Sequence, residues 1–315
     1  MTKAVVATAF GGPEVLSVVD VDVPEPKAGE GTIDVRAASI NPIDYKLYSG
    51  AFGSDESQLP MRLGMEVSGI VSAAGADAQG PAGPVSVGDE VIVFGVDGGY
   101  ADQVTASASG VYPKPPNLSW EQGAGLMLTG GTAYHLLEAT GVTSGDTVLI
   151  HAASGGVGLT AAQLAVRRGA KVIGTAGKSR HDTLRAYGIT PVAYGDGLGE
   201  RIREAAPGGV DVALDTVGTD EAVDVSLELV PDKQRIATVA AFGRAAEAGI
   251  QLLGNGPGAD PGEDIRSRGR VVLADLAAQG KLDVVVARTF PLDQATEAHQ
   301  LVADGHAGGK VVLVP

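Results

Sequence analysis

Residues 146–168, DTVLIHAASGGVGLTAAQLAVRR, contain the strongest indication of the fold in this sequence. This stretch starts with a β-branched apolar run, passes through a glycine-rich turn and ends in a segment with helix-like apolar spacing. The window 153–158 matches the dinucleotide fingerprint G-x-G-x-x-G, except that Ala153 replaces the first glycine. Gly155 allows the backbone to approach a phosphate, and Gly158 allows the helix to pack closely on the strand. The stretch therefore predicts a pyrophosphate-binding turn, with the amide hydrogens of the helix start facing the anion.

The strands and helices that follow this turn support the prediction, because a six-residue fingerprint alone also occurs as a glycine-rich turn in unrelated folds. Helical stretches or turn residues separate β-branched runs at 148–150, 171–175, 191–194, 210–215 and 235–240, with a sixth candidate at 249–253. Parallel strands need crossover connections, so this alternation predicts a doubly wound parallel sheet. Ligands of such sheets bind beyond the carboxyl ends of the strands. The segments expected to converge there are 153–158, 176–178, 216–218 and 241–243.

The end of the second predicted strand indicates which dinucleotide is bound. An NAD site usually carries Asp or Glu about 20 residues beyond the glycine turn, to hold the ribose hydroxyls. Residues 174–180 read GTAGKSR, without an acid. They offer hydroxyls and two cations, Lys178 and Arg180, where NADPH has its extra phosphate. The sequence predicts NADPH over NADH, although either cation can instead be a solvated charge at a helix start.

Composition excludes several classes of function. The chain has 38 Asp and Glu against 23 Lys and Arg, and a net charge of -15 disfavours nucleic acid and anionic membranes as partners. Cysteine is absent, which removes disulfides, thiolate nucleophiles and sulfur ligands for a metal. The N-terminus lacks a signal-peptide pattern, so we expect a cytoplasmic protein. A chain of 315 residues is longer than a single hydrophobic core usually supports, which predicts two domains.

The first 120 residues differ from the parallel region. Short alternating strands such as 31–38, 64–73 and 90–96 lie between Pro and Gly turns, which predicts an antiparallel β-barrel. Beyond the sixth strand candidate, the glycine- and proline-rich segment 254–262 is expected to be either a mobile lid or a linker. The helix, apolar stretch and helix that follow lead to a final strand at 310–314. We expect this C-terminal segment to return to the first domain.

The chain resembles the zinc-independent medium-chain dehydrogenases/reductases, in the branch of zeta-crystallin-like quinone oxidoreductases and enone reductases. The motifs that carry the resemblance are GGPEVL (11–16), NPID (41–44), Glu66 with Gly69, AASGGVG (152–158) and GKVVL (309–313). The resemblance implies a GroES-like β-barrel catalytic domain formed by residues 1–123 and 262–315. It also implies an NADPH-binding Rossmann domain at 124–261, with the nicotinamide in the cleft.

Zinc alcohol dehydrogenases are the nearest competing branch. Their catalytic metal needs Cys and His ligands, yet the Gly-His-Glu motif reads Gly64-Met65-Glu66 here, and a thioether is a poor zinc ligand. No metal is therefore predicted. The histidines show no ligand spacing and are expected to be structural or at the surface: His135, His151, His181, His299 and His306. Without zinc, a conjugated acceptor that delocalises charge itself is a more suitable substrate than a simple alcohol.

The expected reaction is hydride transfer from C4 of NADPH to a quinone, or to the β-carbon of an α,β-unsaturated carbonyl compound, followed by protonation from water. By resemblance, Asn41 and Asp44 line the nicotinamide side of the cleft. Their alternative role is a turn followed by an Asx-type helix cap. The Lys46 ammonium would stabilise the enolate that forms after hydride transfer, unless it is simply solvated.

The remaining candidates complete the expected site. The expected coenzyme contacts are Thr129, Ser154, Gly155, Gly156, Val157, Gly158, Thr175, Ala176, Lys178, Tyr194, Thr216, Phe242 and Lys310. Asp215 is expected to hold backbone instead. Aromatic residues make up only 4% of the chain, so candidates for an acceptor pocket are few. They are Tyr45, Tyr48, Phe52, Phe94 and Tyr100, each of which is equally well placed in a core.

Two other functions stay open on the sequence alone. A dinucleotide fold does not establish chemistry, so an NADPH-binding sensor with little turnover is one alternative. An enoyl reductase for carrier-linked thioesters is the other, although the sequence shows no basic cluster suited to such a carrier. The resemblance also implies a homodimer in which edge strands of two Rossmann sheets pair.

Overall fold

The computed structural model describes residues 1–305 and 307–315, so the expectation for His306 lies outside the described residues. The chain divides into two compact units. The composite unit contains residues 1–128 and 271–315, and the Rossmann unit contains residues 129–270. The boundaries predicted after residues 123 and 261 fall five and nine residues earlier than the unit boundaries after 128 and 270.

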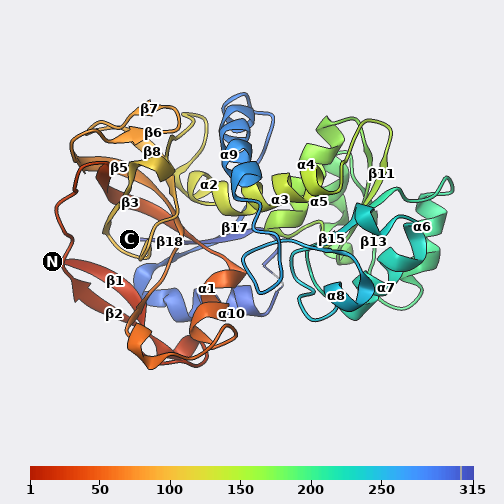
Figure 1. Ribbon diagram of the computed structural model, residues 1–315, viewed down its shortest axis with the longest axis horizontal. Coiled ribbons are helices and arrows are strands. Elements are labelled where there is room, and N and C mark those ends of the chain that lie inside the picture. Colours follow the sequence, from red (N-terminus) through yellow and green to blue (C-terminus); the bar gives the residue numbers. More distant parts are fainter. Residues whose placement is uncertain (306) are drawn as a thin grey trace. The chain divides into compact units, whose positions relative to one another are not determined.

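The Rossmann unit is built on a parallel sheet with the strand order β13-β12-β11-β14-β15-β16. Figure 1 labels β11, β13 and β15 of this sheet. The strands are β11 (Thr147–His151), β12 (Lys171–Thr175), β13 (Thr190–Val192), β14 (Val212–Asp215), β15 (Ile236–Thr238) and β16 (Gln251–Leu252). Each overlaps a run predicted from the sequence, and the order reverses beside β11, as in a doubly wound sheet. The prediction of this fold is confirmed.

Helices connect the strands of this sheet and bury its faces. They are α4 (Gly156–Arg167), α5 (His181–Ala186), α6 (Leu198–Ala205), α7 (Asp220–Leu229) and α8 (Ala245–Ala248). Val148, Leu149 and Ile150 of the central strand are all fully buried. A strand covered on both faces reads as a continuous apolar run rather than an alternating one, which explains the sequence pattern of β11.

The composite unit has a larger, mostly antiparallel sheet with the order β10-β8-β5-β3-β18-β17, in which β9 also pairs with β3. Its strands are β3 (Glu30–Ile40), β5 (Glu66–Ala74), β8 (Glu90–Phe94), β9 (Gln103–Ser107), β10 (Val111–Pro113), β17 (Val286–Pro291) and β18 (Lys310–Val314). A second sheet joins β2 (Leu16–Val21), β1 (Thr2–Ala7) and β4 (Met61–Arg62), and β6 (Gln79–Gly80) pairs with β7 (Gly83–Pro84). Strand β18 pairs with β3, so the C-terminal segment returns to the first unit as expected.

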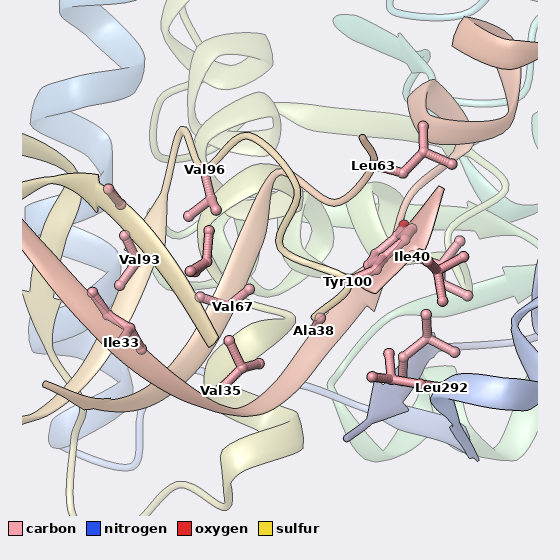
Figure 2. Packing of buried hydrophobic residues seen from close by; sticks show 14 of the residues in the cluster. Ile33, Val35, Ala38, Ile40, Leu63, Val67, Val93, Val96, Tyr100 and Leu292 are labelled. Carbon is pink, nitrogen blue, oxygen red and sulfur yellow. The ribbon is translucent and has the colours of Figure 1, made fainter. Parts of the chain in front are cut away.

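The core of the composite unit lies against its larger sheet (Figure 2). Ile33 and Val35 of β3, Val67 of β5 and Val93 of β8 point into the same cluster as Tyr100.

The other α-helices are α1 (Pro42–Tyr48), α2 (Trp120–Ala124), α3 (Met127–Ala139), α9 (Glu263–Ala278) and α10 (Ala295–Ala303). Among the described residues, no helix is long and apolar enough to cross a membrane.

Candidate active site

The glycine turn of the Rossmann unit exposes the start of α4. Gly155 is the N-cap residue and provides no side-chain hydrogen bond to the helix. Its own N–H donates to the Ala152 carbonyl at 3.0 Å, and Leu159 N–H donates to the Gly155 carbonyl at 2.9 Å. The first amide groups of a helix have no partner within it, so those of Gly156 and Val157 are suited to an anion.

A left-handed residue precedes this turn. Ala152 has φ 55°, a conformation that costs energy in a residue other than glycine and often occurs at functional sites. Thr175, at the end of β12, holds it in place, because the Ala152 N–H donates to Thr175 Oγ1 at 3.0 Å. The Ala153 N–H donates to the Thr175 carbonyl at 2.9 Å. The Thr175 hydroxyl thus supports the shape of the turn from inside the fold.

Close packing explains why glycine occupies position 158. A Cβ added to Gly158 would overlap the Ala152 carbonyl and lie 2.9 Å from the Ala153 Cα. Both atoms belong to the backbone of the turn, so neither can move without displacing the turn or α4. This geometry agrees with the part that the fingerprint gives to its last glycine.

The carboxyl end of β12 carries the predicted coenzyme-selective residues. Lys178 is exposed and begins a short 3₁₀ helix, Lys178–Arg180, which follows the strand after Ala176 and Gly177. The Tyr194 side chain is 56% exposed, although it is aromatic. Its hydroxyl would lie 3.8 Å from a Cβ placed on Gly177, so the ring stands beside the backbone that leads to Lys178. Ala176 is buried, and its carbonyl lies 3.2 Å from His181 Nε2.

The end of β14 is held by a buried carboxylate. Asp215 Oδ1 accepts hydrogen bonds from the backbone N–H groups of Val217 and Gly218, at 2.9 and 2.8 Å. Asp215 Oδ2 accepts one from Thr238 Oγ1 at 2.7 Å. The expectation that Asp215 holds backbone is confirmed. Thr216 Oγ1 donates to the His151 carbonyl at 2.7 Å, so this hydroxyl links neighbouring strands.

Two further predicted coenzyme contacts lie in other parts of the Rossmann unit. Thr129 is buried in the first turn of α3. Phe242 is half-buried and packs so tightly against Gly256 that a Cβ there would overlap the ring. The segment 254–262 is therefore anchored at Phe242, and Gly254 N–H also donates to the Asp260 carbonyl at 2.8 Å.

In the composite unit, the predicted catalytic run begins α1. Asn41 is the N-cap residue, Pro42 occupies the first helical position, and Asp44 lies in the first turn. The Asn41 N–H donates to Asp44 Oδ2 at 2.7 Å, which is the carboxylate contact of a capping box. Tyr100 OH donates to the same oxygen at 2.7 Å. The capping role considered for Asp44 is therefore present.

Glu66 is the centre of this buried cluster, and its side chain is fully buried. Its Oε1 accepts from Ser39 Oγ at 2.5 Å and Asn41 Nδ2 at 3.3 Å, and lies 3.3 Å from Lys310 Nζ. Its Oε2 accepts from the N–H groups at the start of α3, Met127 at 3.1 Å and Leu128 at 2.8 Å. We call the set Ser39, Asn41, Asp44, Glu66, Tyr100 and Lys310 the carboxylate network.

Lys310 connects the two ends of the network. Its ammonium donates to Asn41 Oδ1 at 2.5 Å as well as to Glu66, and the residue is only 5% exposed. The ammonium is thus engaged within the composite unit. Among the described residues, the network contains two carboxylates, Asp44 and Glu66, and one ammonium.

This arrangement changes the acid–base properties of the cluster. Burial raises the pKa of Asp44 to about 6, despite hydrogen bonds from Tyr100 and Asn41 and the attraction of Lys310, which lower it. Asp44 Oδ1 has no hydrogen-bond partner among the described residues and is buried. Burial also lowers the pKa of the half-buried Lys46, in the last turn of α1. Both groups therefore titrate closer to neutrality than they would in water.

The aromatic candidates for an acceptor pocket separate into two groups. Tyr48 and Tyr100 belong to the core, since both are fully buried and Tyr48 OH lies 2.9 Å from His299 Nδ1. Tyr45 is half-buried and packs against that core. Phe52 is 47% exposed, in the loop after α1, and Phe94 is half-buried at the end of β8.

The described residues do not fit a catalytic zinc ion. No group of three or more His, Cys, Asp or Glu that could hold a metal occurs within 1–305 and 307–315. Glu66, which follows Met65 in the motif, is saturated by its donors and paired with a cation. The histidines make internal contacts, His135 with Asp260, His151 with Ser226, His181 with Ala176 and His299 with Tyr48.

Sequence reasoning missed the pairing of Glu66 with Lys310, although both residues occurred in motifs that carry the resemblance. Each is a lone charged residue at the start of an otherwise largely apolar strand. A charge in such a position usually has a buried partner, and this signal was available in the sequence.

Comparisons with known proteins agree with this geometry. A model of the alcohol dehydrogenase GroES-like domain matches residues 27–116, and a zinc-binding dehydrogenase model matches residues 190–313. A quinone oxidoreductase from Pongo abelii is 30% identical over 334 aligned positions, covering 100% of this chain and 98% of that protein. The chain belongs to the quinone oxidoreductase family.

Solved structures of the family and of a related enzyme have the same fold. The Escherichia coli quinone oxidoreductase complexed with NADPH is 28% identical, with a TM-score of 0.86 and coverage of 99% of this chain and 100% of that chain. The CurK enoyl reductase is 27% identical, with a TM-score of 0.85 and coverage of 99% of both chains. The GroES-like and Rossmann assignments for this quinone oxidoreductase family member are thereby confirmed.

Proposed function

We propose that the protein is an NADPH-dependent oxidoreductase that transfers hydride to a quinone or to the β-carbon of an α,β-unsaturated carbonyl compound, without zinc. The observation that carries this proposal is the combination of an uncapped glycine turn with a cationic, carboxylate-free strand end in a quinone oxidoreductase fold. The turn suits a pyrophosphate, and the strand end suits an additional phosphate.

The residues at hand fit NADPH, which supplies the hydride from C4 of its nicotinamide. The turn 154–158 binds the pyrophosphate through the N–H groups of Gly156 and Val157, and Thr175 keeps this turn in shape. Lys178 and Arg180 attract the 2′-phosphate, while the exposed Tyr194 ring covers the adenosine ribose. Thr129, Thr216 and Phe242 are proposed to complete the coenzyme site.

On the acceptor side, residues 41–46 position the start of α1 and stabilise the negative charge that develops on the acceptor. Asn41 and Asp44 fix the start of α1 through their hydrogen bonds, and Lys46 follows on the same short helix. We assign the Lys46 ammonium to the acceptor oxygen, where it stabilises the negative charge that appears as hydride arrives. Water then protonates the product. Tyr45, Phe52 and Phe94 are the proposed apolar contacts of the acceptor.

Zinc independence is supported by the charge arrangement around Glu66. The Lys310 ammonium lies 3.3 Å from Glu66 Oε1, and a divalent cation at the same carboxylate would be repelled by it. An acceptor that delocalises charge does not need a Lewis acid, which agrees with quinones and enones as substrates.

The test is NADPH oxidation with a small quinone and a short-chain enone in parallel, with identification of the products. Formation of hydroquinone or saturated ketone supports the proposal. Tight NADPH binding without turnover of either compound contradicts it and favours a sensor. Turnover of an enoyl thioester alone indicates the carrier-linked chemistry suggested by the likeness to the CurK enoyl reductase.

Replacement of Lys46 tests its role within this reaction. We predict that Lys46→Met lowers kcat for the enone by about 10- to 1000-fold, because loss of one oxyanion-stabilising group has effects up to that order. The dissociation constant for NADPH should stay unchanged. An unchanged kcat would show that Lys46 does not contact the developing charge.

We further propose a cytoplasmic homodimer. Strand β16 lies at one edge of the Rossmann sheet, and edge strands of two such sheets can pair. The Leu252 carbonyl of β16 already accepts a hydrogen bond from the Asp260 N–H at 2.9 Å, so the proposed interface has to accommodate the segment 254–262. Light scattering coupled to size-exclusion chromatography distinguishes this dimer from a monomer.

A further inference from the structure

A buried ion pair lies next to the turn that we assign to the acceptor. Lys310 of β18 and Glu66 of β5 approach to 3.3 Å, and their side chains are 5% and 0% exposed. Such a pair is often no more stabilising than apolar residues of the same size, because both charges lose their hydration. Stability alone therefore does not explain its presence.

The contacts of the pair converge on the Asn41 amide. Lys310 Nζ donates to Asn41 Oδ1 at 2.5 Å, and Asn41 Nδ2 donates to Glu66 Oε1 and to Ser39 Oγ, both at 3.3 Å. Both ends of the amide are held, so its plane has one orientation. Asn41 is also the residue at which α1 starts, and its N–H holds Asp44 Oδ2. The orientation of the amide is thus coupled to the backbone that leads to Lys46.

We propose that Glu66 and Lys310 are positioning residues of the acceptor site, which orient Asn41 and thereby hold the turn 41–46 in its working conformation. This inference rests on the proposed function, because it takes the turn to be the part that acts on the acceptor. It gives Lys310 a place in the carboxylate network instead of the coenzyme contact that the family resemblance implies.

The charge arrangement supplies a readout that simple packing does not. Asp44, Glu66 and Lys310 interact electrostatically, and Lys310 lowers the pKa of Asp44 while Glu66 raises it. Tyr100 also donates to Asp44. Removal of the ammonium should raise the pKa of Asp44, whereas removal of both Glu66 and Lys310 charges should change it less.

The chain contains a matched control for the loss of a buried lysine. Lys114 Nζ lies 3.3 Å from Glu90 Oε2, and its side chain is 5% exposed in the same unit. It donates to the Pro115 and Leu118 carbonyls, outside the carboxylate network. Lys114→Met therefore removes an equally buried lysine, whose partner Glu90 is 54% exposed, without touching the turn.

The experiment compares Lys310→Met, the double variant Glu66→Gln/Lys310→Met and Lys114→Met with the wild-type chain. Lys310→Met leaves Glu66 buried without its cation and destabilises the fold, and the double variant removes that unpaired charge. We measure kcat and KM for a small quinone, the NADPH dissociation constant by fluorescence, and the Asp44 titration by carboxyl NMR. The NMR and fluorescence measurements need no turnover.

For both Lys310 variants, we expect kcat to fall on the order of 10- to 100-fold, because a small misplacement of a reacting group lowers the rate by that order. NADPH affinity should stay within about twofold, and Lys114→Met should leave kcat unchanged. The inference is overturned if Lys310→Met weakens NADPH binding with kcat intact, or if kcat and the Asp44 titration match those of Lys114→Met. A wild-type chain without turnover contradicts the proposed function instead, and the Asp44 titration still shows whether the pair is electrostatically coupled to the turn.

Discussion

Asp44 illustrates how one buried residue combines a local and a distant constraint. Its Oδ2 caps α1 through the Asn41 N–H and also accepts from Tyr100, which is far from it in sequence. The cap was readable from the Asn-Pro-x-Asp run, because capping depends only on neighbouring residues. The hydrogen bond from Tyr100 could not be predicted in this way, because it forms only when distant parts of the chain come together in the fold. A glycine at position 64 permits that approach, since a Cβ there would lie 2.6 Å from the Tyr100 ring.

The raised pKa of Asp44 predicts a pH-dependent stability. The folded-state pKa of about 6 exceeds the ordinary value of 3.8, so the stabilising effect of protonation is present below pH 3.8 and is lost as the pH rises through 6. Asn at this position can accept the same hydrogen bonds without titrating. Relative to Asp44→Asn, the wild-type free energy of unfolding should therefore fall by about 3 kcal/mol between pH 3.5 and pH 8.

Urea unfolding of both proteins across this pH range measures that difference. Because the comparison is between two variants, titrations of groups that do not interact with Asp44 cancel. A difference that stays constant with pH would mean that Asp44 titrates normally.

Lys178 tests the choice of coenzyme at the residue scale. We predict that Lys178→Glu raises the KM for NADPH by about tenfold or more and hardly changes that for NADH, because only NADPH has the 2′-phosphate that the new carboxylate repels. Lys171→Glu is the matched control. This lysine is also exposed, but it lies at the start of β12, whereas Lys178 follows the end of that strand. Equal effects of Lys178→Glu on both coenzymes would refute the assignment.

At the scale of single elements, the glycine turn and β12 depend on each other. Thr175 holds the left-handed Ala152 by a side-chain hydrogen bond, so the end of one strand shapes the turn after another. The turn itself was predictable, since the fingerprint encodes local backbone requirements. The supporting hydrogen bond from Thr175 could not be predicted from the turn sequence, because it depends on the parallel pairing of β11 with β12.

Close packing at the start of α4 predicts the effect of a single methyl group. We expect Gly158→Ala to destabilise the protein by about 1–3 kcal/mol and to weaken NADPH binding, because the added Cβ meets the backbone of Ala152 and Ala153. Gly208→Ala is the control, since a Cβ there has no neighbour within 4 Å. Urea unfolding and NADPH fluorescence measure both effects. Equal stabilities of the two variants would contradict the packing explanation.

At the scale of the whole molecule, the sequence predicted the two-unit organisation and the parallel strands, because each strand carries its own apolar run. The observed boundaries between the units differ from the predicted ones by several residues. Both observed boundaries fall inside helices, one in α3 and one in α9. The carboxylate network was predicted only in part. Its members come from β3, α1, β5, β18 and the loop before β9, and only the sheet order β5-β3-β18 brings these segments together.

Hydride transfer from NADPH without a metal can be measured as quinone-dependent NADPH oxidation after exhaustive treatment of the protein with a chelator. We expect saturable oxidation at the same rate before and after chelation, and a higher kcat/KM with NADPH than with NADH. Loss of activity on chelation with recovery on addition of zinc, or a preference for NADH, would contradict it.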